Sequence, residues 1–189
     1  MFALLTSIQS LLDNGTHVVV AIDGRCCSGK TTLAAFLARR FGGRVVHIDD
    51  FFLPFDLRTP DRLAQIGGNI HTERLMQEVL SHIRDTELYY NRFSCRNGRF
   101  EQVRLTGGAL TVVEGSYSLL PQLRDFYDLT VFCTIGASSQ RKRVTAREGE
   151  RAQMFFDRWI PMEERYFAAY HNPVAADITL DMEDVQCSN

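Results

Sequence analysis

An eight-residue motif, Gly24 to Thr31, constrains the fold of this chain more than any other feature of its sequence. The motif fits the pattern G-x-x-x-x-G-K-[ST] in full, and it lies between an apolar run, Val18 to Ile22, and a segment with helical periodicity. The glycines let successive backbone N–H groups point at anionic oxygens, and the helix that follows presents its positive end to them. The sequence therefore predicts a binding site for a nucleoside triphosphate.

Two side chains of this motif have individual roles in that prediction. Lys30 would reach the outer phosphates, and the hydroxyl of Thr31 would take one coordination position on Mg²⁺. The sequence thus implies ATP and Mg²⁺ as cofactors. The residues predicted to bind the nucleotide are Gly24, Cys26, Cys27, Ser28, Gly29, Lys30, Thr31 and Thr32.

Composition indicates one domain over residues 1–189 with a small-molecule substrate. The chain is 45% hydrophobic, its net charge is -2, and it has no long run of Lys and Arg, so a nucleic-acid partner is not expected. The N-terminal segment resembles neither a signal peptide nor a membrane anchor, and it predicts an amphipathic surface helix closed by Asn14-Gly15. Five cysteines without a C-x-x-C pair indicate reduced thiols and a cytoplasmic location: Cys26, Cys27, Cys95, Cys133 and Cys187.

Apolar runs alternate with helical segments along the chain, which is typical of an α/β fold with a parallel five-stranded sheet flanked by helices. The predicted strands are Val18 to Ile22, Val45 to Ile48, Leu110 to Val113, Leu129 to Ile135 and Ile178 to Leu180. The predicted helices are Thr31 to Arg40, Thr72 to Arg84, Ser138 to Arg147 and Met154 to Tyr170. The last of these has an aromatic face that indicates a structural role. Arg158 and Glu163 lie on its polar side, where they could line the acceptor site, although the surface is the favoured location.

Two segments depart from this alternation. Leu88 to Leu105 contains an Asn97-Gly98 pair between residues of strand character, which predicts a small hairpin that projects from the sheet. Asp56 to Asn69 has the length of the loops that cover substrates, although a passive connection would look the same.

Acidic residues follow two of the predicted strands, at the sheet edge where α/β proteins bind ligands. Asp49-Asp50 comes after the second strand and Glu114 after the third. Carboxylates beside a phosphate loop provide oxygen ligands for Mg²⁺ and a base for an attacking hydroxyl. We therefore predict catalysis by Asp49, and metal binding by Thr31, Glu114 and Asp49.

The motifs resemble those of the uridine kinase and phosphoribulokinase superfamily of P-loop small-molecule kinases. The similar segments are Gly24 to Thr32, IDDFFLP at Ile48 to Pro54, VVEGSYSLL at Val112 to Leu120 and RWIPMEERYF at Arg158 to Phe167. The resemblance implies a P-loop NTPase fold, Asp49 as the base for the acceptor hydroxyl, and Glu114 as an acid linked to Mg²⁺. The DDFF-x-P form is also similar to nicotinamide riboside kinases.

The resemblance also implies an acceptor site, with less agreement between this chain and the family. Cys95 falls near the position of a base-reading histidine, and the acid that would hold the ribose diol is missing unless Glu73 replaces it. The predicted acceptor contacts are Asp49, Phe52, Asn69, His71, Tyr90 and Arg92.

Arginines gather at residues 139–151, where the family resemblance implies a mobile lid. A guanidinium can brace two oxygens of a transferring phosphoryl group while the lid excludes water. Arg143 and Arg147 lie one helical turn apart and are the predicted catalytic arginines, although a charge-rich helix is also typical of a solvated face.

These features favour an ATP-dependent kinase that acts on a hydroxyl group, with a nucleoside as the leading acceptor. Nicotinamide riboside and pantothenate-like acceptors stay open, as do a catalytically inert nucleotide-binding module and assembly into a homo-oligomer. A phosphorylated acceptor would need a second anion site, for which Arg58, Arg62 and Arg74 are candidates. A regulatory GTPase is excluded because the chain has no N-K-x-D motif.

Overall fold

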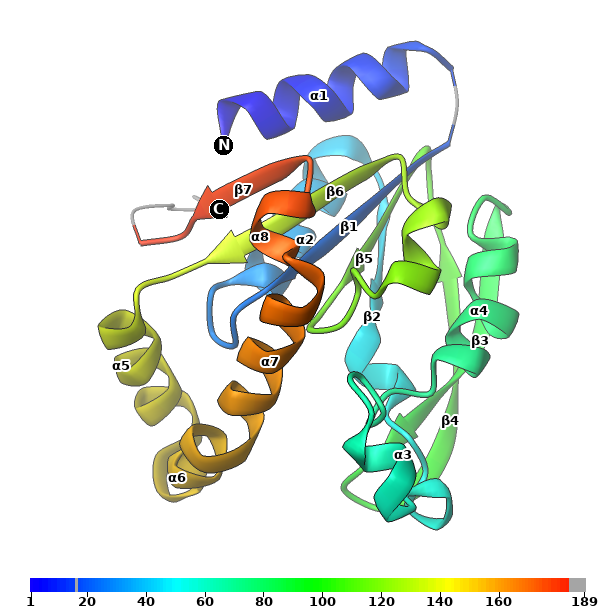
Figure 1. Cartoon of the computed structure of the whole chain (residues 1–189). Coiled ribbons are helices and arrows are strands. Elements are labelled where there is room, and N and C mark those ends of the chain that lie inside the picture. The colour runs from blue at the N-terminus through cyan, green and yellow to red at the C-terminus, as the bar shows by residue number, and fades with distance from the viewer. Residues whose placement is uncertain (16, 184–189) are drawn as a thin grey trace.

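The computed structural model, which describes residues 1–15 and 17–183, contains one five-stranded parallel sheet (Figure 1). The strand order is β2-β5-β1-β6-β7, with β1 at the centre. This confirms the predicted α/β fold. The strands are β1 (Val18–Gly24), β2 (Arg44–His47), β5 (Leu110–Glu114), β6 (Leu129–Thr134) and β7 (Ile178–Asp181).

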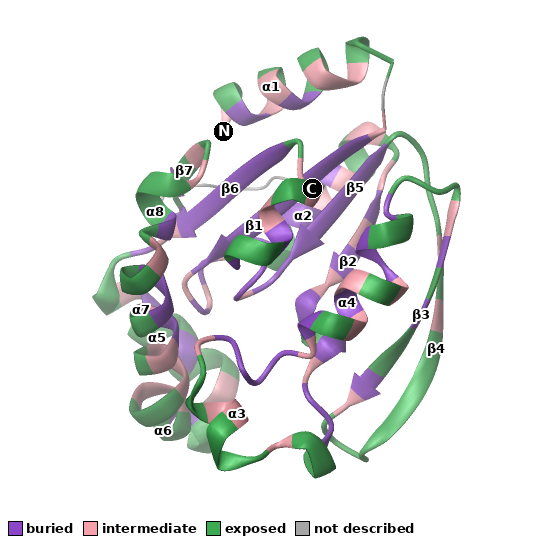
Figure 2. Ribbon diagram, turned by 45° about the vertical axis from the view of Figure 1, so that its right-hand side comes forward, coloured by how far each residue is buried: buried purple, intermediate pink, exposed green. Residues whose placement is uncertain are grey.

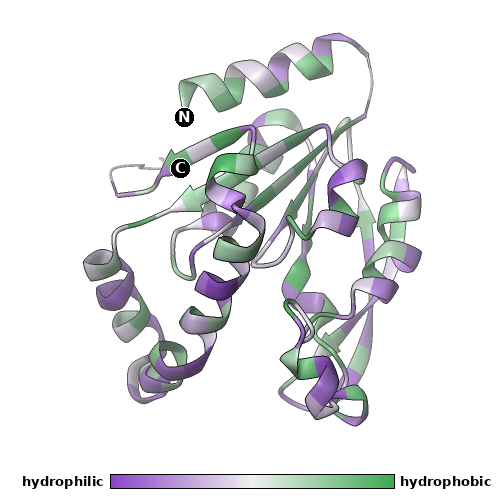
Figure 3. Cartoon of the chain, viewed as in Figure 1, coloured by the Kyte–Doolittle hydropathy of each residue, from purple (hydrophilic) through white to green (hydrophobic). Residues whose placement is uncertain are grey.

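Helices cover both faces of the sheet because its central strands are apolar on both sides (Figures 2 and 3). Val18, Val20 and Ile22 of β1 pack with α1 (Phe2–Asp13) and α2 (Lys30–Phe41). Val19 faces the opposite way, into a cluster with side chains of α4 (Thr72–Glu78) and α7 (Ile160–Tyr170). The amphipathic N-terminal helix is therefore confirmed.

Two predicted helices are shorter or less regular than the sequence indicates. The helix predicted for Thr72 to Arg84 ends at Glu78, and a 3-10 turn at Leu80–His82 follows it. The helix predicted for Met154 to Tyr170 is divided into α6 (Ala152–Met154), a π-helical turn (Phe155–Trp159) and α7. The remaining helices are α3 (Pro60–Ala64), α5 (Ala137–Glu148) and α8 (Asn172–Ala175), and further 3-10 turns lie at Ile48–Phe51, Phe55–Leu57, Pro121–Phe126 and Gly149–Arg151.

The predicted hairpin is present as a separate two-stranded antiparallel sheet, β3 (Glu87–Ser94) and β4 (Arg99–Thr106). Gly98 has a φ of 68°, and the side chain of Asn97 accepts a hydrogen bond from the backbone of Arg99, so both residues shape the turn. The segment between Asp56 and Asn69 is not an irregular loop, because it contains α3, which is capped by the Thr59 side chain.

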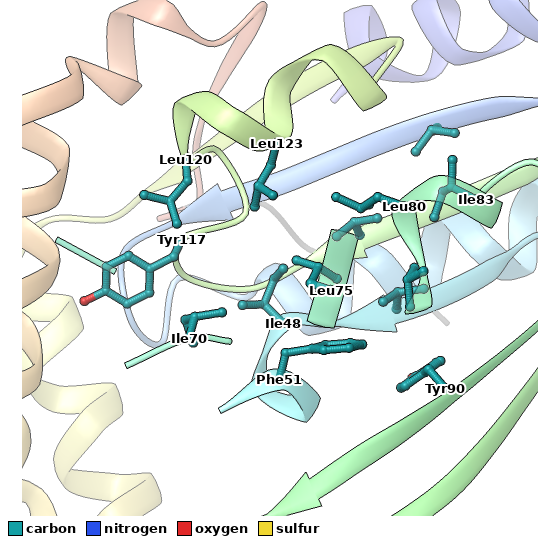
Figure 4. Close-up of a cluster of buried hydrophobic side chains, with 14 of the residues drawn as sticks. Ile48, Phe51, Ile70, Leu75, Leu80, Ile83, Tyr90, Tyr117, Leu120 and Leu123 are labelled. Atoms are coloured by element: carbon teal, nitrogen blue, oxygen red, sulfur yellow. The ribbon is translucent and has the colours of Figure 1, made fainter. Parts of the chain in front are cut away.

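One of the hydrophobic clusters joins the hairpin to the sheet (Figure 4). Tyr90 of β3 points into this cluster and lies against Phe51, with ring centroids 5.2 Å apart. This contact anchors the hairpin beside the turn at Ile48–Phe51, which carries the Asp49-Asp50 pair.

Within residues 1–15 and 17–183, the structure has no helix with the length and apolar character needed to cross a membrane.

Candidate active site

The predicted phosphate-binding motif, referred to below as the phosphate loop, connects β1 to α2 at the carboxyl edge of the sheet. Gly24 and Gly29 have φ angles of 136° and 101°, which side chains rarely tolerate. A Cβ atom at Gly24 would lie 2.0 Å from the carbonyl oxygen of Cys133 in the neighbouring strand. The loop therefore packs against β6 only because glycine occupies this position.

Lys30 forms hydrogen bonds with the backbone of the loop. Its Nζ donates to the carbonyl oxygens of Gly24 at 2.7 Å and Arg25 at 3.0 Å, and its side chain is buried. Burial alone would lower the pKa of Lys30, but the nearby carboxylates of Glu163 and Asp23 raise it above the usual value. Lys30 is thus a charged ammonium group held at the loop.

Glu163 of α7 is buried at this site, and not at the surface location that the sequence favoured. One carboxylate oxygen accepts from the backbone N–H of Cys26 at 2.9 Å, and the other accepts from the hydroxyl of Ser116 at 2.5 Å. Burial raises the pKa of Glu163, and the charge of Lys30 opposes that shift. Helical periodicity could not reveal this role, because Glu163 contacts Cys26, which lies 137 residues earlier in the sequence.

Replacement of Glu163 by alanine should lower the free energy of unfolding by about 2 kcal/mol, since the buried N–H of Cys26 loses its acceptor. Denaturant unfolding measures this cost. Glu164 provides a matched control, because it is partly exposed and forms an ion pair with Arg25 at the protein surface. Glu164→Ala should cost less than about 1 kcal/mol. Equal losses for both variants would contradict a specific role of Glu163 at the loop.

Thr31 and Glu114 come together as a candidate metal site. The hydroxyl of Thr31 lies 3.2 and 3.3 Å from the two carboxylate oxygens of Glu114. The described parts of the chain contain no group of three or more His, Cys, Asp or Glu side chains that could hold a metal ion. Mg²⁺ does not need such a group, because it usually binds one or two protein carboxylates and completes its coordination shell with water and phosphate oxygens. These oxygen ligands therefore fit Mg²⁺.

His47 is a further residue of this group that sequence reasoning missed. Its Nδ1 lies 2.6 Å from a Glu114 oxygen, and this hydrogen bond raises the pKa of His47. The register of the sheet explains the contact, because His47 of β2 is paired with Glu114 of β5. Its position two residues before Asp49 was the only sequence signal.

Asp49 lies between two cavities. The larger, about 930 Å³, borders the phosphate loop, and the smaller, about 550 Å³, lies between the Asp49-Asp50 turn and the hairpin. Partial loss of hydration raises the pKa of Asp49, the charge of Glu114 raises it further, and Lys30 opposes both effects. Asp50 instead accepts a hydrogen bond from the Tyr90 hydroxyl at 2.8 Å.

Most predicted site residues border the larger cavity: Cys26, Cys27, Gly29, Lys30, Thr31, Thr32, Asp49, Phe52, Asn69, Glu114, Arg143 and Arg147. Gly24 and Ser28 are buried within the loop and do not line the cavity. Arg92 lies in the smaller cavity and forms an ion pair with Glu101.

Two predicted acceptor contacts lie outside both cavities. Tyr90 is 3% exposed and belongs to the hydrophobic cluster, because its ring stacks on Phe51 and its hydroxyl is held by Asp50. His71 precedes α4 and lines neither cavity. Neither side chain lines either of the two cavities, so the structure gives these two predicted contacts no support, and their role toward an acceptor stays a prediction.

The arginines of α5 approach the phosphate loop. Arg143 donates to the backbone oxygens of Met182 at 3.2 Å and Cys27 at 3.5 Å, and Arg147 Nη2 lies 3.5 Å from the sulfur of Cys26. The segment that follows α5 also contributes side chains to the larger cavity: Arg151, Phe155, Arg158 and Trp159. The sequence left this location open for Arg158, whereas the aromatic pattern indicated a core role for Phe155 and Trp159.

The three arginines considered for a second anion site are each engaged by other groups. Arg62 forms an ion pair with Glu73, and Arg74 forms one with Glu78. Arg58 borders the larger cavity and donates to the sulfur of Cys95 at 3.3 Å. The structure therefore does not support the hypothesis of a site for an acceptor that already carries phosphate.

Known structures share this fold at low sequence identity. A possible uridine kinase from Bacillus stearothermophilus is 20% identical, with 88% of this chain and 89% of that chain covered and a TM-score of 0.68. TT1252 from Thermus thermophilus is 18% identical, with 88% of each chain covered and a TM-score of 0.51. No protein-family model and no curated protein matches the chain. The likeness shows the α/β fold, and it identifies neither the activity nor the substrate.

Proposed function

We propose that this chain is an ATP-dependent kinase that transfers the γ-phosphoryl group to a hydroxyl of a small molecule. One observation carries the proposal: Asp49 borders both the cavity beside the phosphate loop and the cavity beneath the hairpin. A base in that position can meet a nucleotide on one side and an acceptor on the other. A nucleoside is the leading acceptor, in keeping with the resemblance of the sequence motifs to uridine kinases.

The proposed reaction is an in-line displacement. The acceptor oxygen forms a bond to the γ-phosphorus, the bond to the bridging oxygen of ADP breaks, and Asp49 takes the proton of the hydroxyl. Lys30, Arg143 and Arg147 would balance the charge on the phosphate oxygens. Thr31 and Glu114 would hold Mg²⁺, which when bound neutralises charge on the outer phosphates.

The test combines calorimetry of MgATP binding with ADP release in the presence of uridine, cytidine, nicotinamide riboside or pantothenate. We expect binding of MgATP and acceptor-dependent ADP release with a nucleoside. Tight binding without acceptor-dependent release for the whole panel would support an inert nucleotide-binding module. Release only with nicotinamide riboside or pantothenate would keep the kinase and replace the acceptor.

The single tryptophan, Trp159, provides a direct signal for occupation of the larger cavity. Addition of MgATP should change its emission intensity, because the indole ring borders that space. Fluorescence titration measures the effect, and the signal should disappear in Trp159→Phe while calorimetry still detects binding. Binding by calorimetry without any change of emission in the native protein would place the nucleotide elsewhere.

A further inference from the structure

Two adjacent thiols lie inside the phosphate loop, and the proposed reaction uses neither of them. Cys26 is 8% exposed and Cys27 is half-buried, and both border the larger cavity. Their sulfur atoms are 3.9 Å apart, with the Cys26 thiol donating to Cys27. Cys27 is therefore the accessible member of the pair, and it has a donor that stabilises its thiolate form.

The charges around the pair favour the same form. Arg147 Nη2 lies 3.5 Å from the Cys26 sulfur, and Lys30 is held at the loop. Glu148 lies near Cys27 and Glu163 near Cys26, and both oppose ionisation. The hydrogen bond from Cys26 outweighs burial and lowers the pKa of Cys27 to about 7, with help from Arg147 and Lys30. A thiolate beside cations is the usual setting of a reactive cysteine.

The backbone at Cys27 adopts an uncommon conformation within the loop. Its φ angle is 59°, a left-handed conformation that is uncommon for a residue with a side chain. The residue lies between the two glycines that shape the phosphate cradle. Because Cys27 borders the larger cavity, an adduct on its sulfur would occupy part of the space beside the loop.

We propose that Cys27 is a modification site for low-molecular-weight disulfides. The Cys27 thiolate attacks one sulfur of the reagent, a new disulfide bond forms, the original one breaks, and the second half leaves as a thiolate. Closure to a Cys26–Cys27 disulfide is disfavoured, because adjacent Cα atoms are only about 3.8 Å apart, below the usual range for disulfides. The product is thus a mixed disulfide that a free thiol can reverse.

The effect on activity rests on the proposed function, since the adduct matters only if the loop binds a nucleotide. The chemistry itself does not depend on it. Mass spectrometry can therefore test the modification separately from nucleotide binding.

The experiment treats the full-length reduced protein with oxidised glutathione and locates the adduct by peptide mass spectrometry. Cys95 is the comparison thiol, because it is exposed and borders the same cavity. Its sulfur accepts from the Arg58 guanidinium at 3.3 Å, so it shares a neighbouring cation with the Cys26–Cys27 pair but has no adjacent thiol in the sequence. At pH 7 Cys27 should react roughly threefold faster than Cys95, since the Cys26 thiol donor, Arg147 and Lys30 favour the Cys27 thiolate, and the lower nucleophilicity of such a thiolate offsets part of the gain. The rate at Cys27 should rise with pH around a midpoint of about 7, and Cys26→Ala should move that midpoint upward.

MgATP should slow the reaction at Cys27 more than at Cys95, because Cys27 belongs to the loop itself whereas Cys95 lies in the hairpin turn on the same cavity. The modified protein should lose MgATP binding by calorimetry, and dithiothreitol should restore it. Reaction at Cys95 before Cys27, or conversion of Cys26 and Cys27 to an internal disulfide, would overturn the proposal. So would unchanged MgATP affinity after stoichiometric modification of Cys27. Absence of binding in the untreated protein would instead refute the nucleotide site, while labelling of Cys27 would still stand.

Discussion

Replacement of Lys30 by alanine is expected to lower turnover by about 100-fold or more, the typical loss when a group that stabilises transition-state charge is removed. The ammonium group lies inside the loop and is charged, because Glu163 and Asp23 raise its pKa. A coupled assay of ADP release, with the acceptor identified from the panel, measures the loss.

The same substitution should also destabilise the protein without ligand. Lys30 donates to two loop carbonyls and lies near two buried acids, so alanine leaves these groups without their cation. We expect a loss of about 3 kcal/mol in the free energy of unfolding. The effect on turnover must therefore be measured at a temperature at which the variant is folded.

Lys142 offers a matched control, because it is the only other lysine of the chain and is exposed on α5. Lys142→Ala should change neither turnover nor stability appreciably. If folded Lys30→Ala kept near-normal turnover, the assignment of the loop as the phosphate site would be wrong.

The sequence predicted the architecture well because buried parallel strands and helices leave regular patterns. All five predicted strands are present, and the phosphate loop lies between β1 and α2 as expected. The predicted strand ends differ from the observed ends by one or two residues. Two strands were predicted too short because they continue into a polar residue, Asp23 or Glu114, which a search for apolar runs leaves out.

The site was predictable where it depends on local sequence, and less so where it depends on tertiary contacts. Gly24 and Lys30 belong to one continuous motif. Glu163 and His47 reach the site only through helix packing and sheet register. Tyr90 is the converse case, because an aromatic residue in a hairpin can face a ligand or the core, and here Phe51 and Asp50 hold it in the core.

Substitution of Asp49 by asparagine should lower turnover by about 100-fold or more and leave MgATP binding largely intact, since the amide cannot take the proton of the acceptor hydroxyl. The adjacent Asp50 provides the comparison, because its carboxylate is engaged by the Tyr90 hydroxyl and borders only the smaller cavity. Asp50→Asn should raise the KM for the acceptor more than it lowers kcat.

The pH profile gives an independent test of the same assignment. Partial loss of hydration and the charge of Glu114 raise the pKa of Asp49, so the base should become protonated at a higher pH than an ordinary aspartate. In the native protein kcat/KM should therefore fall on acidification through a pKa above the usual value for aspartate, and Asp49→Asn should lose this acidic decrease.

The raised pKa of Asp49 also has a consequence for stability. The ionised carboxylate is disfavoured in the folded state, so its contribution to stability decreases as pH rises through the raised pKa. Asp49→Asn should accordingly be no less stable than the native protein at neutral pH, and near-normal turnover of this folded variant would remove Asp49 from the role of base.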